Sequence, residues 1–206
     1  MVFQNRHDAA ARLGEALRKY EGKNGVIVGL PRGGIPLAYF LAKLLHFQMV
    51  VIPSKKIGHP FNKEYAIGAV TLEGRVIKHV ADVADSYIES ETERLRKILL
   101  AKEQFYGGAE LVGGLKDKTV IIVDDGIATG CTMEAVVELV NSKHPAKVIV
   151  AVPVAPPAAV VKLTSKVDEI ICLHQPAEFY AVGLFYRDFS PVSDQEVRRL
   201  VEMAPG

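Results

Sequence analysis

The 206-residue chain has no tryptophan and only two cysteines, Cys131 and Cys172. Two isolated cysteines exclude a disulfide scaffold, and there is no CxxC or HxxxH pair that would suggest a structural zinc site. No apolar run reaches the ~18 residues of a membrane span, and the first residues lack the apolar segment of a signal peptide. These absences predict a cytoplasmic protein with no membrane partner.

The chain also has little net charge, since 25 Lys and Arg residues face 24 Asp and Glu residues, for a formal charge of +1. Proteins that bind nucleic acid non-specifically usually carry a basic excess, so the charge balance argues against a nucleic-acid partner. Hydrophobic residues make up 49% and charged residues 24%, as in ordinary globular proteins. No repeat or linker interrupts the chain, so residues 1–206 are expected to form a single domain.

Short apolar runs alternate with helical patterns along most of the chain. Apolar runs at residues 26–30 and 49–53 flank a helical pattern at 35–45. The alternation resumes later, with expected strands at 119–123, 147–152 and 167–173 and expected helices at 132–141 and 158–163. This order predicts an α/β fold with a mostly parallel central sheet flanked by helices. Ligands of such sheets bind beyond the carboxyl ends of the strands.

The middle of the chain follows a different pattern. Residues 55–65 are polar and contain Gly58 and Pro60, which predicts an irregular segment. Residues 66–72 and 75–80 are expected to pair as a hairpin. Residues 84–105 form one long charged helical pattern, and four glycines between 107 and 114 mark a loop after it.

The most informative motif follows the apolar run at residues 120–123. Asp124 and Asp125 come directly after it, and a loop rich in Gly and Thr then leads into a helix. Backbone N–H groups of such a loop and the helix N-terminus form a site for a phosphate group. Paired carboxylates can accept sugar hydroxyls or hold hydrated Mg²⁺. The alternatives are an Asp-capped turn or a Walker-B strand end, but the chain has no G-x-x-x-x-G-K-[ST] loop to accompany the latter.

Two further loops follow strands at the same predicted edge. The turn at residues 31–34 combines Arg32, a bidentate anion donor, with Gly33 and Gly34, which free the backbone N–H groups. By itself such a turn is common, so its anion-binding interpretation depends on the distant acidic motif. Lys55 and Lys56 follow the second strand, either as solvated surface or facing an anion, and Lys56 is slightly favoured.

Residues 120–132 resemble the signature of type I phosphoribosyltransferases, which bind 5-phosphoribosyl pyrophosphate (PRPP). The shared pattern is an apolar strand, two acids, two spacers, Ala or Asp, then Thr-Gly and Thr. The order of motifs over residues 20–190 also matches: the 31–34 turn corresponds to the family's pyrophosphate loop, and residues 57–117 to its flexible-loop insertion. A little-characterised bacterial and archaeal subgroup is especially similar.

The resemblance implies a role for each motif. Asp124 and Asp125 would hold the ribose hydroxyls, directly or through Mg²⁺, and Arg32 and Lys56 would neutralise the pyrophosphate. Gly33 and Gly34 would also contact the pyrophosphate. The remaining residues of the motif would cradle the 5-phosphate: Gly126, Ile127, Ala128, Thr129, Gly130 and Thr132.

Residues 174–190 are unusually aromatic and resemble the hood that covers the base in purine phosphoribosyltransferases. On this match Phe179 stacks on the base, Val182 contacts it, and Asp188 faces the metal and pyrophosphate. Aromatic clusters are more often core than binding platforms, so packing is the alternative interpretation.

Residues 58–65 could form a lid that excludes water from the reacting centre. His59, Asn62 and Glu64 are therefore candidate site residues, with Glu64 as a candidate base, although an ordinary polar loop is the alternative. Two departures bear on the acceptor. Ala128 replaces the Asp that 6-oxopurine enzymes place beside the purine, and residues 150–154 lack the Lys that reads the purine oxygen. Both argue against hypoxanthine and guanine.

The sequence thus predicts a Mg²⁺-dependent phosphoribosyltransferase that transfers the phosphoribosyl group of PRPP to a nitrogen nucleophile, expected to be a nucleobase. Its partners would be PRPP and a small-molecule acceptor, and a homodimer is the family's common state. One alternative is a non-catalytic regulator that senses PRPP or a nucleotide. Another is a nucleotide hydrolase that uses the two acids as metal ligands.

Overall fold

The computed structural model describes residues 2–78, 82–107 and 112–205 and is built around a five-stranded sheet. The strand order is β2-β1-β6-β7-β8, and every neighbouring pair is parallel. The strands are β1 (Gly25–Gly29), β2 (Gln48–Val51), β6 (Thr119–Val123), β7 (Lys147–Val154) and β8 (Glu169–His174). The α/β fold with a parallel central sheet is therefore confirmed.

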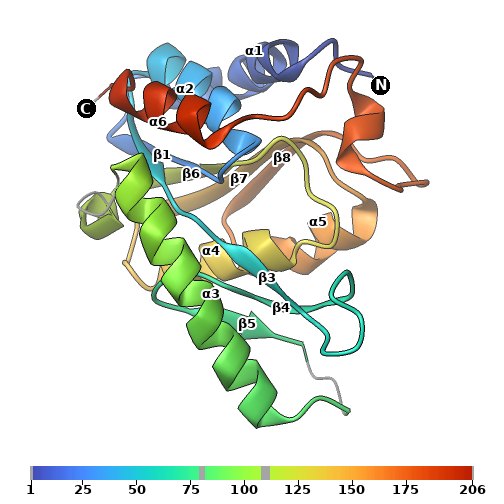
Figure 1. The fold of residues 1–206 in the computed structure, drawn as a ribbon. Coiled ribbons are helices and arrows are strands. Elements are labelled where there is room, and N and C mark those ends of the chain that lie inside the picture. The colour runs from blue at the N-terminus through green and yellow to red at the C-terminus, as the bar shows by residue number, and fades with distance from the viewer. Residues whose placement is uncertain (1, 79–81, 108–111, 206) are drawn as a thin grey trace.

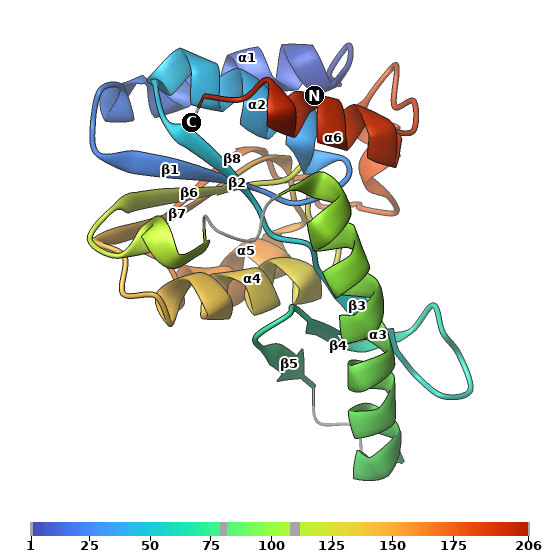
Figure 2. The same ribbon diagram turned by 60° about the vertical axis from the view of Figure 1, so that its left-hand side comes forward.

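Helices cover both faces of this sheet (Figures 1 and 2). On one face lie α1 (Arg6–Leu17), α2 (Gly34–Leu45) and α6 (Asp194–Glu202). On the other lie α4 (Cys131–Asn141) and α5 (Pro157–Thr164). In the described part of the chain, no helix is long and apolar enough to cross a membrane.

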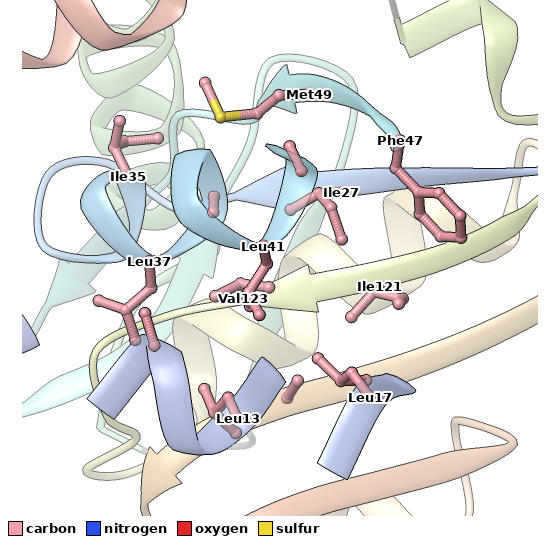
Figure 3. Packing of buried hydrophobic residues seen from close by; sticks show 14 of the residues in the cluster. Leu13, Leu17, Ile27, Ile35, Leu37, Leu41, Phe47, Met49, Ile121 and Val123 are labelled. Carbon is pink, nitrogen blue, oxygen red and sulfur yellow. The ribbon is translucent and has the colours of Figure 1, made fainter. Parts of the chain in front are cut away.

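The strands are apolar throughout because both faces are buried. Ile121 and Val123 of β6 pack with α1 and α2, while Val120 and Ile122 pack on the α4 side. Figure 3 shows the first of these clusters, where Leu13 of α1 lies close to the side chains of the sheet. This two-sided burial explains why continuous apolar runs identified the strands.

A second, smaller sheet lies below the first and has the antiparallel order β3-β4-β5. Its strands are β3 (Lys55–Gly58), β4 (Ala66–Val70) and β5 (Arg75–Ile77). The long helix α3 (Asp85–Tyr106) packs against it through Leu95 and Leu99, and α4 contacts β4 through Ala135. The predicted hairpin and long helix are thus present within the 57–117 insertion.

The prediction of an irregular segment at 55–65 was wrong for its first residues, which form β3. This strand lies at the edge of the small sheet and carries Lys55 and Lys56, so it has no apolar run. Its pairing comes from β4, a partner that local sequence does not reveal. Residues 79 and 80 of the predicted hairpin and Gly108 of the predicted loop lie outside the described residues.

The remaining elements are short. Helix α6 begins at the N-cap Ser193, whose side chain accepts a hydrogen bond from the backbone N–H of Glu196. Only Val197 of this helix is fully buried, so it gives a weak apolar pattern. The 3₁₀ turns are η1 (Arg18–Tyr20), η2 (Val112–Leu115) and η3 (Val182–Phe185).

Glu169 ties the edge strand β8 to the rest of the fold. Its carboxylate accepts hydrogen bonds from Lys19 Nζ at 2.5 Å, from Lys147 Nζ at 3.2 Å and from the Tyr20 hydroxyl. Burial alone would raise the pKa of Glu169, but these three donors lower it from 4.5 to about 2.

We therefore expect Glu169→Gln to destabilise the protein in a pH-dependent way. A carboxylate with a depressed pKa in the folded state stabilises above its unfolded value and loses that effect as the pH falls through its folded value. The free energy of unfolding should fall by about 1–2 kcal/mol at pH 7 and hardly at all near pH 2. Urea unfolding at both pH values measures this, with the exposed Glu89→Gln as control. An equal loss at both pH values would contradict the prediction.

Candidate functional site

The 31–34 turn and the 124–132 loop meet because they follow two adjacent parallel strands. The register of β1 and β6 pairs Gly29 with Val123, so both strands end at the same level. The backbone N–H of Leu30 then donates to the carbonyl of Val123 at 3.1 Å. Motifs about 90 residues apart in sequence are thereby joined at the carboxyl edge of the sheet, where ligands of such sheets bind.

Two glycines make this contact close. A Cβ atom at Gly33 would lie 1.9 Å from Asp125 Oδ2, and one at Gly34 would lie 2.7 Å from the carbonyl oxygen of Val123. Neither position has room for a side chain. The glycines of the turn therefore serve the packing of one loop on the other.

A pocket of about 180 Å³, here called the loop pocket, opens beside the 124–132 loop. Asp124 lies in its wall, Lys56 reaches it from β3, and Val182 reaches it from η3. The remaining lining residues are Gly126, Ile127, Ala128, Thr129, Gly130, Thr132 and Met133. The structure thus brings together most of the residues that the sequence analysis assigned to sugar phosphate.

The backbone of the loop suits an anion. Helix α4 begins at Cys131, so the N–H groups of its first turn have no acceptor within the helix. Gly130 precedes it with φ of 77°, a left-handed conformation that favours glycine. Ile127 is different: its N–H donates to the carbonyl of Val154 at 2.9 Å. The expected phosphate contact of Ile127 therefore cannot come from its amide, because that amide binds the end of β7.

Asp124 is the acid that faces the loop pocket. The residue as a whole is partly exposed but its carboxyl group is buried, and Oδ1 accepts a hydrogen bond from the backbone N–H of Asp125 at 2.8 Å. Burial, followed by the charge of Asp125, raises the pKa of Asp124 well above its usual value. Mg²⁺ is commonly bound by one or two carboxylates together with substrate oxygens, and Asp124 fits that role.

Asp125 does not line the loop pocket, and the expectation that it faces the sugar or the metal stays a prediction. Its carboxylate forms an ion pair with Arg6, with 2.8 Å between Arg6 Nη2 and Asp125 Oδ2. The backbone oxygen of Asp125 accepts a hydrogen bond from the Tyr186 hydroxyl at 2.6 Å. Sequence reasoning missed Arg6, because a lone arginine 119 positions away carries no local motif.

A second pocket of about 300 Å³, the cationic pocket, is lined in part by Pro31 and Arg32 of the 31–34 turn. Arg32, Lys55 and Lys102 line it, together with the carboxylate of Asp194. Asp194 accepts hydrogen bonds from Lys102 Nζ and from the Tyr106 hydroxyl, which lower the pKa of Asp194 in that order.

The two lysines of β3 serve different pockets. Successive side chains of a strand point to opposite faces, so Lys55 lines the cationic pocket and Lys56 the loop pocket. Lys55, and not Lys56, therefore lines the same pocket as Arg32, while the pyrophosphate contact expected of Lys56 stays untested.

The hood at 174–190 contacts the site through Val182. Phe179 instead stacks on Phe185 within the hood, with ring centroids 5.4 Å apart and 22° between the planes. Asp188 is exposed and accepts hydrogen bonds from the Ser190 N–H and hydroxyl. Among the described residues, no group of three His, Cys, Asp or Glu side chains could by itself hold a metal, and the indirect metal contact expected of Asp188 stays a prediction.

The predicted lid protrudes from the small sheet as the loop between β3 and β4 (Figures 1 and 2). His59 Nε2 lies 3.3 Å from the carboxylate of Asp82, and Phe61 is 89% exposed. His59, Asn62 and Glu64 line neither the loop pocket nor the cationic pocket. The structure does not bring these three residues to the acids.

Comparison with protein families agrees with this geometry. The family model described as phosphoribosyl transferase domain matches residues 3–186. Two Mycobacterium tuberculosis proteins, one from each of two strains and each named "Putative phosphoribosyl transferase", are 35% identical over 209 residues. The match covers 98% of this chain and 47% of theirs, so the chain spans about half the length of these relatives.

Solved structures give the same fold. The protein TT1426 from Thermus thermophilus is 38% identical, with complete coverage of both chains and a TM-score of 0.84. A hypothetical protein from Neisseria gonorrhoeae with bound ppGpp is 15% identical, with 98% coverage of each chain and a TM-score of 0.55. At that identity the second likeness extends to the fold alone.

We expect Gly33→Ala to disturb both loops, because the added methyl group would collide with the carboxylate of Asp125. Overpacking of this kind should lower the free energy of unfolding by about 1–3 kcal/mol. Gly74→Ala is the matched control, since the nearest atom to its added Cβ lies 3.6 Å away. That substitution should change the free energy by less than about 1 kcal/mol. Urea unfolding compares them, and equal effects would argue against the close contact.

Proposed function

Because the chain belongs to the phosphoribosyl transferase family, we propose that it transfers the 5-phosphoribosyl group of PRPP to a nitrogen nucleophile and releases pyrophosphate. The observation that carries this proposal is the placement of Asp124 in the wall of the loop pocket, beside the turn that leads to the cationic pocket. PRPP has the matching order of groups: a phosphate, a ribose and a pyrophosphate.

The 5-phosphate belongs in the loop pocket. There the N–H groups at the start of α4, the Thr129 and Thr132 hydroxyls and the Lys56 ammonium supply donors of the right kind. The positive end of the α4 dipole adds to this attraction. A phosphate fixed here would orient the ribose toward Asp124, which can accept hydrogen bonds from the ribose hydroxyls.

The pyrophosphate belongs in the cationic pocket. Arg32 offers a bidentate fork and Lys55 and Lys102 add charge, so the pocket can stabilise the polyanion as it departs. When bound at Asp124, Mg²⁺ would supply further positive charge for the leaving group.

In the proposed reaction, the bond between ribose C1 and the pyrophosphate oxygen breaks and its electron pair leaves with pyrophosphate. The lone pair of the acceptor nitrogen forms the new bond to C1, and the nitrogen gives its proton to water. Positive charge develops on the sugar ring as the leaving group departs. In its ionised form Asp124 would stabilise that ring, and the loop pocket would fix the sugar's position.

The acceptor side is formed by the hood. Val182 lines the loop pocket and would offer an apolar contact to a planar base, and in the same hood Phe179 stacks on Phe185. Ala128 offers no carboxylate to a purine nitrogen. We therefore propose a nucleobase other than hypoxanthine or guanine as the acceptor.

A panel of nucleobases and small amines, incubated with PRPP and Mg²⁺ and scored for released pyrophosphate, tests the proposal. Release with at least one acceptor is expected, and none once the metal is chelated. Binding of PRPP without release in any reaction would instead identify a sensor of the ligand. Phosphate release from nucleoside triphosphates would identify a hydrolase.

Asp124→Asn should weaken the binding of PRPP in the presence of Mg²⁺ by about tenfold or more, because a charge-assisted interaction contributes about 1.5–3 kcal/mol. Titration calorimetry measures this affinity. Glu89→Gln removes an exposed carboxylate of α3 and should leave the affinity unchanged. Unaltered binding by the Asp124 variant would remove the basis of the proposal.

Lys55 and Lys56 provide a matched pair for separating the two pockets. Lys56→Gln should weaken the binding of ribose 5-phosphate by about fivefold or more and leave the binding of inorganic pyrophosphate unchanged. Lys55→Gln should weaken the binding of pyrophosphate by a similar factor and leave that of ribose 5-phosphate unchanged. Each variant removes one ammonium from the same strand, so each is the other's control. Calorimetry with both ligands decides, and equal effects of both variants on both ligands would refute the assignment of the pockets.

A further inference from the structure

Arg6, at the start of α1, uses three nitrogen atoms as donors, two toward Asp125 and one toward the hood. Its Nε and Nη2 lie 2.9 and 2.8 Å from Asp125 Oδ2, and its Nη1 donates to the carbonyl of Ser190 at 2.8 Å. The guanidinium carbon lies 4.0 Å from the centre of the Phe189 ring. With 12% of its side chain exposed, Arg6 is far more buried than is usual for an arginine.

Asp125 has little freedom to leave this partner. The residue is 8% exposed, and its Oδ2 lies only 1.9 Å from the position that a Cβ atom of Gly33 would take. Tyr186 holds its backbone through the hydrogen bond to the carbonyl oxygen. A buried carboxylate is stable only when it is paired, and Arg6 supplies the pairing cation.

The backbone fixes the position of Arg6 as well. The residues before it pair with the hood: the N–H of Phe3 donates to the carbonyl of Phe185 at 2.8 Å, and the N–H of Asp188 donates to that of Gln4 at 2.9 Å. Asn5 then caps α1 through a hydrogen bond from the N–H of Asp8 to its side chain. The first turn of α1, which carries Arg6, is therefore held by the pairing with the hood and by the Asn5 cap.

We propose that Arg6 is a positioning residue of the substrate site: it neutralises Asp125 and holds it against Gly33, so that Asp124 alone of the two acids meets the sugar and the metal. The proposal rests on the proposed function and assigns different roles to the two acids. Asp124 binds the substrate. Asp125 contacts the hood, the 31–34 turn and the N-terminal segment and thereby holds Asp124 in position.

If this is correct, the charge of Asp125 is dispensable provided that Arg6 is replaced too. Either single substitution leaves one buried charge without its partner and should distort the loop. The double variant Arg6→Gln/Asp125→Asn removes both charges and keeps side chains that can hydrogen-bond each other. If Asp125 instead contacts the sugar or the metal itself, the double variant must bind as poorly as Asp125→Asn.

Titration calorimetry with PRPP and Mg²⁺ distinguishes these cases. Arg6→Gln and Asp125→Asn should each weaken binding by about tenfold or more, and the double variant should recover to within about threefold of the native protein. Failure of the double variant to recover overturns the proposal. Arg12→Gln is the control, because Arg12 also lies on α1 and pairs with a carboxylate, Asp8, but is exposed. It should bind as the native protein does.

The same variants tested without ligand separate this proposal from the proposed function. In urea unfolding, the double variant should be more stable than either single variant, because the two substitutions are coupled. If the native protein binds no PRPP, the proposed function fails, while coupled stabilities still support the pairing of Arg6 with Asp125. Additive stabilities show that the residues act independently and overturn the proposal whether or not PRPP binds.

Discussion

The site depends on the contact between the 31–34 turn and the first residues of the 124–132 loop. Parallel pairing of β1 with β6 brings the two strand ends level, and Gly33 and Gly34 allow the backbones to touch. With larger residues there, the two loops would separate, and the pocket lined by the turn would move away from the pocket lined by the loop. The register of a buried sheet is strongly specified, so this arrangement is fixed by the fold and does not await a ligand.

The charges of the site come largely from outside the central sheet. Lys55 and Lys56 belong to the small sheet, Lys102 to α3 and Arg6 to the start of α1. A chain with a formal net charge of +1 thereby gathers these cations at one edge, where Arg6 and Lys102 are paired with carboxylates. Such local concentration of one sign attracts an anionic ligand without creating general affinity for polyanions.

The sequence was sufficient for the central sheet, because strands buried on both faces are continuous apolar runs such as Thr119–Val123. It also identified the 124–132 loop, where the chemistry is local to the motif. It could not predict β3, whose pairing depends on a strand that comes later in the chain, or assign Lys55 and Lys56 to different pockets before the strand was known. Arg6 was unpredictable for a similar reason, since its partner is distant in sequence and only the folded backbone brings them together.

The pairing of Phe3 and Gln4 with Phe185 and Asp188 has a consequence for biosynthesis. This pairing brings together residues from opposite ends of the chain, and contacts of such long sequence separation form slowly. During synthesis the amino-terminal segment emerges first but stays without its partner until residues beyond 188 have left the ribosome. In a nascent chain, the strands of the sheet can therefore pair before Arg6 and Asp125 are held in place. A chain that ends before the hood lacks part of the site.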